Sequence, residues 1–505
     1  MPSAHLAIDL GASSGRAILG ILSASPKTLQ IKEIHRFEHI GLPTPTGPVW
    51  NLTDIWRNIL EGMKKTAAYC VQQHLELESI GVDTWGVDWA LLGESGELLA
   101  LPHCYRDPQN NAAHTEALEK LGGFPWLYER SGIQDMAINT LFQVYARFKE
   151  EPQLFAAARH LVFMPDLFHF WLSGKISVER SIASTSAMLN VANGTWDYQI
   201  FERLGMPTHL LGPIIDPGTR LGTVTAEVAG ATGVPSTLAV VAPASHDTGS
   251  AVAAVPAETT EGWAYLSSGT WSLLGAELSK PNCSQAALEV PFTNELGIDG
   301  TVRFLKNITG LWMVQELRRE HNEQNESETG FAELMQLAEA AEPCRTLVDP
   351  SFGEFLAPGN MAGKIAAFAE RTGQPVPETI GQFVRCCLES LAFCYRDVLE
   401  KMQEVVGQSF SQLHVVGGGS KNSLLNQLTA DITGMQVICG PAEATAIGNV
   451  LIQAIGCDQL ADINELREVV KRCTSPEVVV PNPESAYPDA FGRYEVICAK
   501  AASTN

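Results

Sequence analysis

Long uncharged apolar segments are missing from this 505-residue sequence. It contains no run of about 18 uncharged apolar residues, the length that crosses a bilayer as a helix. A basic segment followed by an apolar one, as in a secretory signal, is also missing from the N-terminus. Transmembrane and secreted classes are therefore not expected, and we expect a cytoplasmic protein without membrane contact.

Paired cysteine motifs are missing as well. The 11 cysteines are scattered, and no C-x-x-C pair has a matching second pair. This pattern favours reduced thiols over a disulfide framework or a structural zinc site. A zinc or redox enzyme is accordingly the least favoured of the functions considered.

Positive charge is scarce, with 34 basic against 57 acidic residues and a formal net charge of -23. Such a balance opposes non-specific binding to nucleic acid or to anionic membranes, so no nucleic-acid partner is expected. It does not exclude a nucleotide ligand, because backbone N–H groups and Mg²⁺ can hold phosphates without many lysines.

Two common phosphate-binding motifs are not found. The sequence has no G-x-x-x-x-G-K-[ST] and no G-x-G-x-x-G. Neither a P-loop nucleotide-binding domain nor a Rossmann dinucleotide-binding domain is therefore favoured.

What the sequence does contain is an apolar strand, a turn of small residues and a second apolar strand, "AIDLGASSGRAILGIL" at 7–22. The turn, 11–15, holds only Gly, Ala and Ser, so its backbone can approach a ligand and its N–H groups can converge on a phosphate. Arg16 adds charge, and Asp9 stands where a hydrated Mg²⁺ could bridge carboxylate and phosphate. The alternative is a loose hairpin with a capping aspartate.

The same plan returns in "AYLSSGTWSLLGAEL" at 264–278, about half the chain later. We interpret this as two related halves, with domains at 1–243 and 244–505 and a boundary near "LAVVAPASHD". A third small-residue stretch, "VVGGGSKN" at 415–422, suits a flat group lying against the backbone. The alternative is that all three are ordinary Gly/Ser turns between elements.

Strand-like runs alternate with helical patterns along the chain, which predicts an α/β protein. Residues 381–405 keep the three-to-four spacing of one buried helical face, and residues 423–431 are also expected to be helical. The expected strands lie within 6–10, 79–92, 160–165, 238–247, 263–278 and 412–419.

Asp247 is a candidate general base because it follows an apolar strand and a histidine, with small residues after it. A carboxylate there can accept the proton of a hydroxyl nucleophile. The alternative is that Asp247 caps the helix that begins at this point.

"DTWGVDW" at 83–89 could form a sugar pocket, with Asp83 and Asp88 accepting hydrogen bonds and Trp85 covering a C–H face. The alternatives are core packing for the tryptophan and a surface turn for Asp88. Further along, Asn307 and Gln315 are eight residues apart, and we expect both on one face of a helix.

Taken together, these stretches resemble the FGGY carbohydrate kinases, which share the fold of actin, hexokinase and Hsp70. The resemblance covers essentially the whole chain, and the order of the motifs is that of the family. The motifs are AIDLGASSGR, SIGVDTWGVDWALL, LPHCYRD, YERSGIQ, NTLFQ, MPDLF, ASHDTGSAV, YLSSGTWSL, LKNITGLWMVQ, SQLHVVGGGSKNSLLNQLTAD and GPAEATAIGN.

The resemblance implies two ribonuclease H-like α/β domains with a central cleft, and ATP with Mg²⁺ as cofactors. It implies Asp247 as the catalytic base, and Asp9 remains the candidate for the metal. The implied nucleotide contacts are Ala12, Ser13, Ser14, Gly15, Arg16, Thr270, Gln315 and Gly418. The implied sugar contacts are Gly86, His246, Asp247, Thr248 and Asn307.

The reaction implied by the resemblance is transfer of a phosphoryl group from ATP to the 1-hydroxyl of a ketose, with L-rhamnulose as the expected substrate. A kinase for fuculose, xylulose or a related polyol is the nearest alternative. A non-catalytic nucleotide switch of the actin or Hsp70 type is the alternative from another class. The small-molecule partners would be the ketose and ATP, and the chain would act as a monomer or homodimer.

Overall fold

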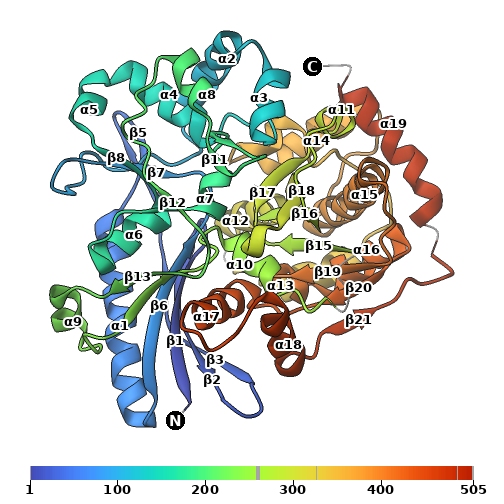
Figure 1. Ribbon diagram of the computed structural model, residues 1–505. Coiled ribbons are helices and arrows are strands. Elements are labelled where there is room, and N and C mark those ends of the chain that lie inside the picture. The colour runs from blue at the N-terminus through green and yellow to red at the C-terminus, as the bar shows by residue number, and fades with distance from the viewer. Residues whose placement is uncertain (1, 258–261, 326, 486, 503–505) are drawn as a thin grey trace. The chain divides into compact units, whose positions relative to one another are not determined.

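Two mixed sheets form the framework of the computed structural model, which describes residues 2–257, 262–325, 327–485 and 487–502 (Figure 1). The first sheet has the order β13-β14-β6-β1-β2-β3. Its strands are β1 (Ser3–Leu10), β2 (Ser14–Leu22), β3 (Leu29–Glu38), β6 (Glu76–Thr84), β13 (Thr219–Thr223) and β14 (Ala239–Ala242).

The second sheet has the order β17-β18-β16-β15-β19-β20-β21. Its strands are β15 (Trp263–Ser268), β16 (Trp271–Leu278), β17 (Thr293–Leu296), β18 (Val302–Thr309), β19 (Gln412–Val416), β20 (Gln436–Cys439) and β21 (Glu477–Val479).

The two sheets repeat one topology. In the first, β1 pairs antiparallel with β2 and parallel with β6, which pairs parallel with β14, whose other neighbour β13 is antiparallel. In the second, β15, β16, β19, β20 and β21 repeat these relations in the same order. The predicted relation between the two strand–turn–strand segments therefore extends to five strands of each sheet.

The chain forms two compact units, and neither is continuous in sequence. Unit 1 comprises Met1–Pro256, Glu277–Phe304 and Ala444–Thr474. Unit 2 comprises Ala257–Ala276, Leu305–Glu443 and Ser475–Asn505. This division differs from the expected contiguous domains 1–243 and 244–505, because α10 (Asp247–Ala253) and α17 (Ala444–Gly456) pack with the first sheet's unit.

Unit 1 contains most of the helices. They are α1 (Leu52–Gln73), α2 (Gln109–Leu121), α3 (Phe124–Ser131), α4 (Thr140–Glu150), α5 (Pro152–Ala157), α6 (Met164–Ser173), α7 (Arg180–Ser184), α8 (Tyr198–Leu204), α9 (Ala226–Thr232), α10, α11 (Gln285–Glu289), α17 and α18 (Ile463–Cys473).

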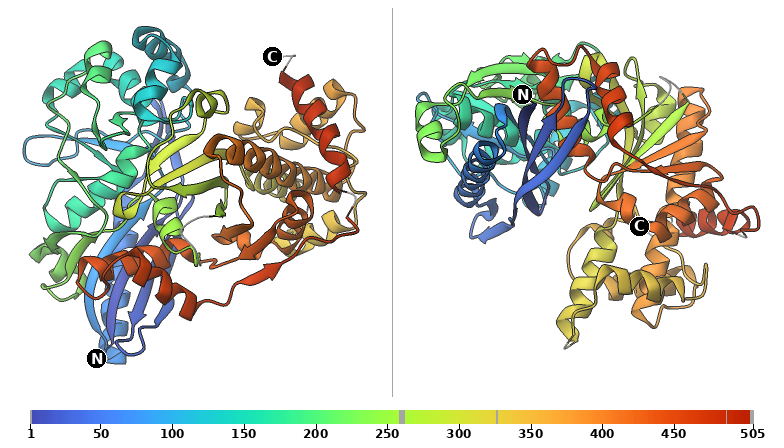
Figure 2. Two further views of the ribbon diagram at one scale, coloured as in Figure 1. Left: turned by 45° about the vertical axis from the view of Figure 1, so that its right-hand side comes forward. Right: turned by 90° about the horizontal axis from the view of Figure 1, so that it is seen from below.

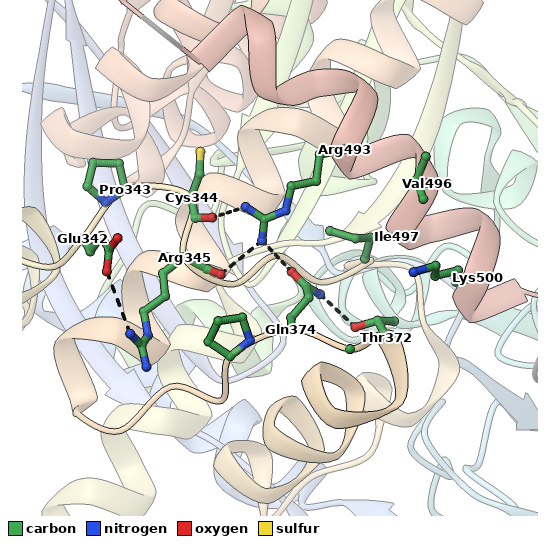
Figure 3. Close-up of a pocket in the computed structure, with 12 residues that line it drawn as sticks. Glu342, Pro343, Cys344, Arg345, Thr372, Gln374, Arg493, Val496, Ile497 and Lys500 are labelled. Carbon is green, nitrogen blue, oxygen red and sulfur yellow. Dashed lines mark hydrogen bonds and ion pairs between the residues drawn. The ribbon is translucent and has the colours of Figure 1, made fainter.

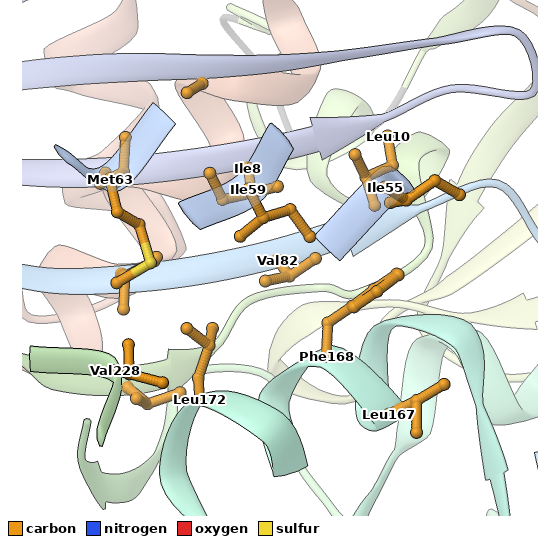
Figure 4. Close-up of a cluster of buried hydrophobic side chains, with 14 of the residues drawn as sticks. Ile8, Leu10, Ile55, Ile59, Met63, Val82, Leu167, Phe168, Leu172 and Val228 are labelled. Carbon is orange, nitrogen blue, oxygen red and sulfur yellow. The ribbon is translucent and has the colours of Figure 1, made fainter. Parts of the chain in front are cut away.

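Apolar side chains from α1 and α6 cover one face of the first sheet. Figure 4 shows Ile8 and Val82 of the sheet packed with Ile55 of α1 and Phe168 of α6. All four are almost fully buried. Because neighbouring strand residues point to opposite faces, the residues beside Ile8 and Val82 point away from this core.

That opposite face is polar and is covered by α17. Along it, the Ser79 hydroxyl donates to Gln453, the Gln453 amide donates to Asn449, and the Asn449 amide donates to Asp83 (2.6, 2.6 and 2.5 Å). His5 also contacts the Ser79 hydroxyl, at 2.7 Å. A buried polar network therefore leads along the sheet to its carboxyl edge.

In unit 2 the predicted helix at 381–405 is α15 (Ile380–Val406), whose regularly spaced apolar residues are buried as expected. Figure 2 shows the unit in two further views. The other helices of unit 2 are α12 (Trp312–Gln324), α13 (Phe331–Glu339), α14 (Met361–Thr372), α16 (Ser423–Thr433) and α19 (Phe491–Ala502). Among the described residues, no helix combines the length and apolar character needed to cross a bilayer.

Candidate active site

Three acidic residues lie at or beyond the carboxyl ends of neighbouring parallel strands of the first sheet. Asp9 is the penultimate residue of β1 and the register partner of Asp83 on β6. The next residue of β6, Thr84, forms a parallel bridge with His246. His246 directly precedes Asp247 in the chain. Because the carboxyl ends of parallel strands meet at one edge, Asp9, Asp83 and Asp247 gather there.

Asp247 is the first residue of α10, and its side chain is 30% exposed. Its Oδ1 accepts from the backbone N–H and the hydroxyl of Thr248, at 2.6 and 3.1 Å. The N-cap position belongs to His246, so Asp247 is the first helical residue and not the N-cap that the alternative predicts. Burial raises the pKa of Asp247 above its usual range, against the opposing charge of His246.

Asp83 is fully buried beside Asp247 and Asp9. Its Oδ2 accepts from Asn449, whereas its Oδ1 has no hydrogen-bond partner among the described residues. Burial, followed by the negative charge of Asp9, raises the pKa of Asp83 well above its usual range. A cation at this edge would give the unpaired Asp83 oxygen a partner and would reduce the repulsion between the carboxylates.

Asp9 is paired with Arg16, its register partner across the β1–β2 hairpin. The turn between them is tight, because the Gly11 N–H donates to the Ser14 carbonyl at 2.9 Å. Ala12 and Ser14 are half-buried and Ser13 is exposed, so the turn is accessible to a ligand. Of the predicted residues 12–16, Arg16 therefore contacts Asp9, and its positive charge also acts on Asp83.

The carboxylates at this edge suit a Mg²⁺ ion that keeps most of its water ligands better than a metal ion whose ligands all come from the protein. Among the described residues, no group of three or more His, Cys, Asp or Glu side chains converges as metal ligands. Mg²⁺ keeps most of its waters and needs only one or two carboxylates from the protein. Asp9 and the unpaired oxygen of Asp83 meet that requirement.

Gly86, His246 and Thr248 also come together here. A Cβ on Gly86 would stand 3.2 Å from His246 Nε2. The next residue, Val87, has φ of 68°, a conformation that a β-branched residue rarely adopts. Its carbonyl accepts from the side chains of Thr140 and Gln143, at 2.6 and 3.2 Å.

Thr140 and Gln143 hold this strained turn but were not predicted from the sequence. In the sequence they stand only as two residues in the first turn of a helix, about 50 residues after Val87. Nothing in that position indicates that they bind the Val87 carbonyl.

Trp85 of "DTWGVDW" supports the core-packing alternative. Trp85 is nearly buried and packs against Trp50, with ring centroids 4.4 Å apart and ring planes tilted by 43°. Asp88 Oδ2 accepts from both indole N–H groups, at 2.8 Å from Trp85 and 2.6 Å from Trp50. Asp88 is therefore an internal anchor of the aromatic pair and does not lie in a surface turn.

The Asp88→Asn variant is expected to change how stability depends on pH. Burial raises the pKa of Asp88 to about 7 from an ordinary 3.8, so the folded state keeps a proton that the unfolded state has released. Wild-type stability therefore falls as pH rises through 7, by about 1 kcal/mol between pH 6 and 7.5. The variant retains an acceptor for both indoles but has no carboxyl group that titrates. Its free energy of unfolding should therefore not fall by this amount between pH 6 and 7.5.

Urea unfolding of both proteins at pH 6 and 7.5 measures the difference. A parallel pH dependence in wild type and variant would contradict the expectation. The exposed Asp216→Asn serves as the control, because Asp216 is paired with Arg180 at the surface and should behave as wild type.

The predicted nucleotide residues of unit 2 form a second cluster. The Thr270 hydroxyl donates to Gln315 at 3.2 Å. The start of α12 is fixed to the β15–β16 turn, since the Leu311 N–H donates to the Gly269 carbonyl at 3.0 Å. Gly418 is exposed with open space around it, whereas a Cβ on the next glycine would strike the Ser268 side chain.

Asn307 lies on β18, and Gln315 lies on α12. The expectation that both share one helical face is wrong. The strand continues to Thr309, and Gly310 then packs so closely on β16 that its Cβ would stand 2.6 Å from the Trp271 backbone. The chain thus turns from strand to helix between the two residues.

A separate hollow in unit 2 contains none of the predicted site residues (Figure 3). Figure 3 shows Arg493 between Cys344 and Gln374. Its guanidinium donates to the Cys344 carbonyl at 2.6 Å and to the Gln374 side chain at 3.1 Å. These bonds fix α19 to the loop at 342–345, so we interpret the basic residue as structural.

Comparison with known proteins identifies matches along nearly the whole chain. Residues 4–254 match the N-terminal domain of the FGGY family of carbohydrate kinases, and residues 264–457 match its C-terminal domain. A rhamnulokinase from Bacteroides thetaiotaomicron is 39% identical over 97% of this chain and 98% of the relative. A rhamnulokinase from Klebsiella pneumoniae is 38% identical over 95% of both chains.

Solved structures share the fold at low identity. A xylulose kinase from Lactobacillus acidophilus superposes with a TM-score of 0.80 at 16% identity, over 99% of both chains. A gluconate kinase from the same species has a TM-score of 0.79 at 15% identity, covering 100% of this chain and 99% of the other. The α/β fold class predicted from the sequence is confirmed.

Proposed function

Since the chain belongs to the FGGY family of carbohydrate kinases, we propose that it transfers the terminal phosphoryl group of ATP to the 1-hydroxyl of L-rhamnulose. The choice of sugar rests on the two rhamnulokinases, which align with nearly all of the chain. The choice of reaction rests on one observation: a partly exposed carboxylate, Asp247, stands near Asp9 at the carboxyl edge of the first sheet.

Phosphoryl transfer depends on positioning and on stabilising charge. Asp247 accepts the proton of the attacking hydroxyl, and its raised pKa brings its basicity closer to neutral pH. His246, Thr248 and Gly86 position the sugar from the same edge of the sheet. Asn307 is proposed as a further sugar contact, supplied by β18.

The nucleotide is assigned to two sets of residues. Residues 12–16 of unit 1 bind phosphate oxygens through backbone N–H groups, hydroxyls and the Arg16 guanidinium. Thr270, Gln315 and Gly418 of unit 2 bind the nucleotide. Asp9 would hold Mg²⁺ through its waters, and the bound ion would neutralise charge on the phosphates.

A panel of ketoses tests the proposal. ADP release, measured by a coupled assay, should be fastest with L-rhamnulose and should require Mg²⁺. A preference for fuculose or xylulose would reassign the substrate within the family. ATP hydrolysis that no sugar changes would instead favour a nucleotide switch. The proposal places the enzyme in the cytoplasm, where its eleven free thiols stay reduced.

Gly86→Ala is expected to raise KM for the ketose about three- to tenfold, equivalent to roughly 1 kcal/mol, with KM for ATP unchanged. The added methyl group would lie 3.2 Å from His246 Nε2, where it narrows the sugar site. Gly212→Ala is the control, because its Cβ would make only an ordinary 3.6 Å contact. Steady-state kinetics with each substrate varied would show an unaltered ketose KM if Gly86 is remote from the sugar.

A further inference from the structure

Two buried charged residues contact His246 on the side away from the sheet edge. Glu295 of β17 and Arg303 of β18 form an ion pair of 2.8 Å, with side chains 5% and 1% exposed. Glu295 Oε2 is 3.1 Å from His246 Nδ1, and Arg303 Nη1 is 3.2 Å from the same nitrogen. All three residues belong to unit 1.

The pair is too deeply buried to be explained by stability alone. Removing two charges from water is costly, and a buried pair often contributes no more than apolar residues of the same size. Arg303 is further bound by the Leu296 carbonyl, to which it donates at 3.3 Å. Burial opposes ionisation of Glu295, but the neighbouring positive charges outweigh it and lower the pKa of the carboxyl.

The opposite nitrogen of the same ring faces the proposed base. His246 Nε2 is 3.4 Å from Asp247 Oδ1. The imidazole therefore stands between the buried pair and the reacting carboxylate, and contacts on Nδ1 determine the ring's orientation and which nitrogen carries the proton.

We propose that Glu295 and Arg303 are positioning residues for phosphoryl transfer, which act by fixing the His246 ring against Asp247. The assignment rests on the proposed kinase function, since it is that reaction in which Asp247 serves as the base. Both side chains are buried, so we assign them an action through His246 and none directly on the substrate or the nucleotide.

The backbone of this segment is held separately. Glu179 accepts from the Ser245 N–H at 3.0 Å and from the Ser181 hydroxyl at 2.6 Å. That hydroxyl in turn accepts from the His246 N–H at 3.2 Å. Removing the Glu295 charge should therefore free the His246 ring while the chain path before Asp247 is retained.

Glu295→Gln is the first test, and it should lower kcat ten- to hundredfold, the range expected when a reacting group is displaced by about 1 Å. KM for ATP should not change. In a His246→Gln background the same substitution should have little further effect, because a residue that acts only through His246 loses its role with it. Independent, multiplying losses in the double variant would overturn the proposal.

Glu277→Gln is the matched control. Glu277 forms a buried pair of 2.9 Å with Arg467 in the same unit, and both side chains are 10% exposed. Glu277→Gln should be at least as destabilised as Glu295→Gln, with a melting temperature no higher. Its kcat should nevertheless equal that of wild type. If Glu295→Gln does not fold, the double variant Glu295→Gln/Arg303→Gln replaces it, because no unpaired charge then remains in the interior.

Ring ¹⁵N shifts of labelled histidine give a readout that needs no activity. The His246 nitrogens should shift in Glu295→Gln and stay unchanged in Glu277→Gln. Unmoved His246 signals with wild-type kcat in folded Glu295→Gln would refute the positioning role. Wild-type protein that phosphorylates no ketose would refute the kinase function instead, and the shifts would still report whether the pair fixes the ring.

Discussion

Asp247→Asn is expected to lower kcat for ketose phosphorylation by about 10²- to 10⁴-fold, the usual contribution of a general base. The amide keeps the size of the carboxyl and can still accept from Thr248, but it cannot take the proton of the sugar hydroxyl. Affinity for ATP should stay within a few-fold. Steady-state kinetics and equilibrium nucleotide binding measure the two effects separately.

The pH profile of wild type gives a second check on the same residue. Below its pKa, Asp247 carries a proton and cannot accept another, so kcat falls as pH falls. Because burial raises that pKa, the fall should begin at a higher pH than for an exposed aspartate. The apparent pKa belongs to the carboxylate cluster, since the negative charge of Asp9 raises the pKa of both Asp247 and Asp83.

Asp216→Asn serves as the control for this prediction, because Asp216 is a surface residue paired with Arg180. It should leave kcat and its pH profile unchanged. Near-normal turnover in Asp247→Asn would remove this residue from the role of base.

Gly448→Ala should destabilise the protein by about 3 kcal/mol, at the upper end of overpacking in a filled core. A Cβ at this position of α17 would stand 1.8 Å from the Ser250 carbonyl oxygen of α10. The Ser250 oxygen belongs to the main chain, and the position of a Cβ is fixed by its own main chain. Rotation of a side chain therefore cannot relieve the clash. The two helices must separate, and α10 carries Asp247 at its first residue.

Thermal unfolding detects the loss, at roughly 1–2 °C per kcal/mol for a unit of this size. Activity of the folded fraction should fall as well, because α10 shifts. Gly230→Ala on α9 is the matched control: its Cβ would meet nothing within 4 Å, so the change should be neutral or stabilise by up to about 1 kcal/mol. Equal melting temperatures for Gly448→Ala and wild type would show that the helices can separate without cost.

Local patterns in the sequence were sufficient for the elements that carry the fold. The spacing at 381–405 predicted α15, and the small-residue turns predicted the β1–β2 and β15–β16 hairpins. Each of these depends on residues within one helix or one hairpin. The same reasoning failed at Asn307, because the strand character of β18 depends on a sheet partner distant in sequence.

By itself the sequence determined the α/β class, the repeated strand–turn–strand plan and Asp247 as the candidate base, because periodicity and residue type are local properties. The tertiary structure alone decided that 277–304 and 444–474 join unit 1, and that Glu295 and Arg303 reach the ring beside that base. Such contacts follow from how whole sheets and helices pack, and residues 57 apart share no local signal of their meeting.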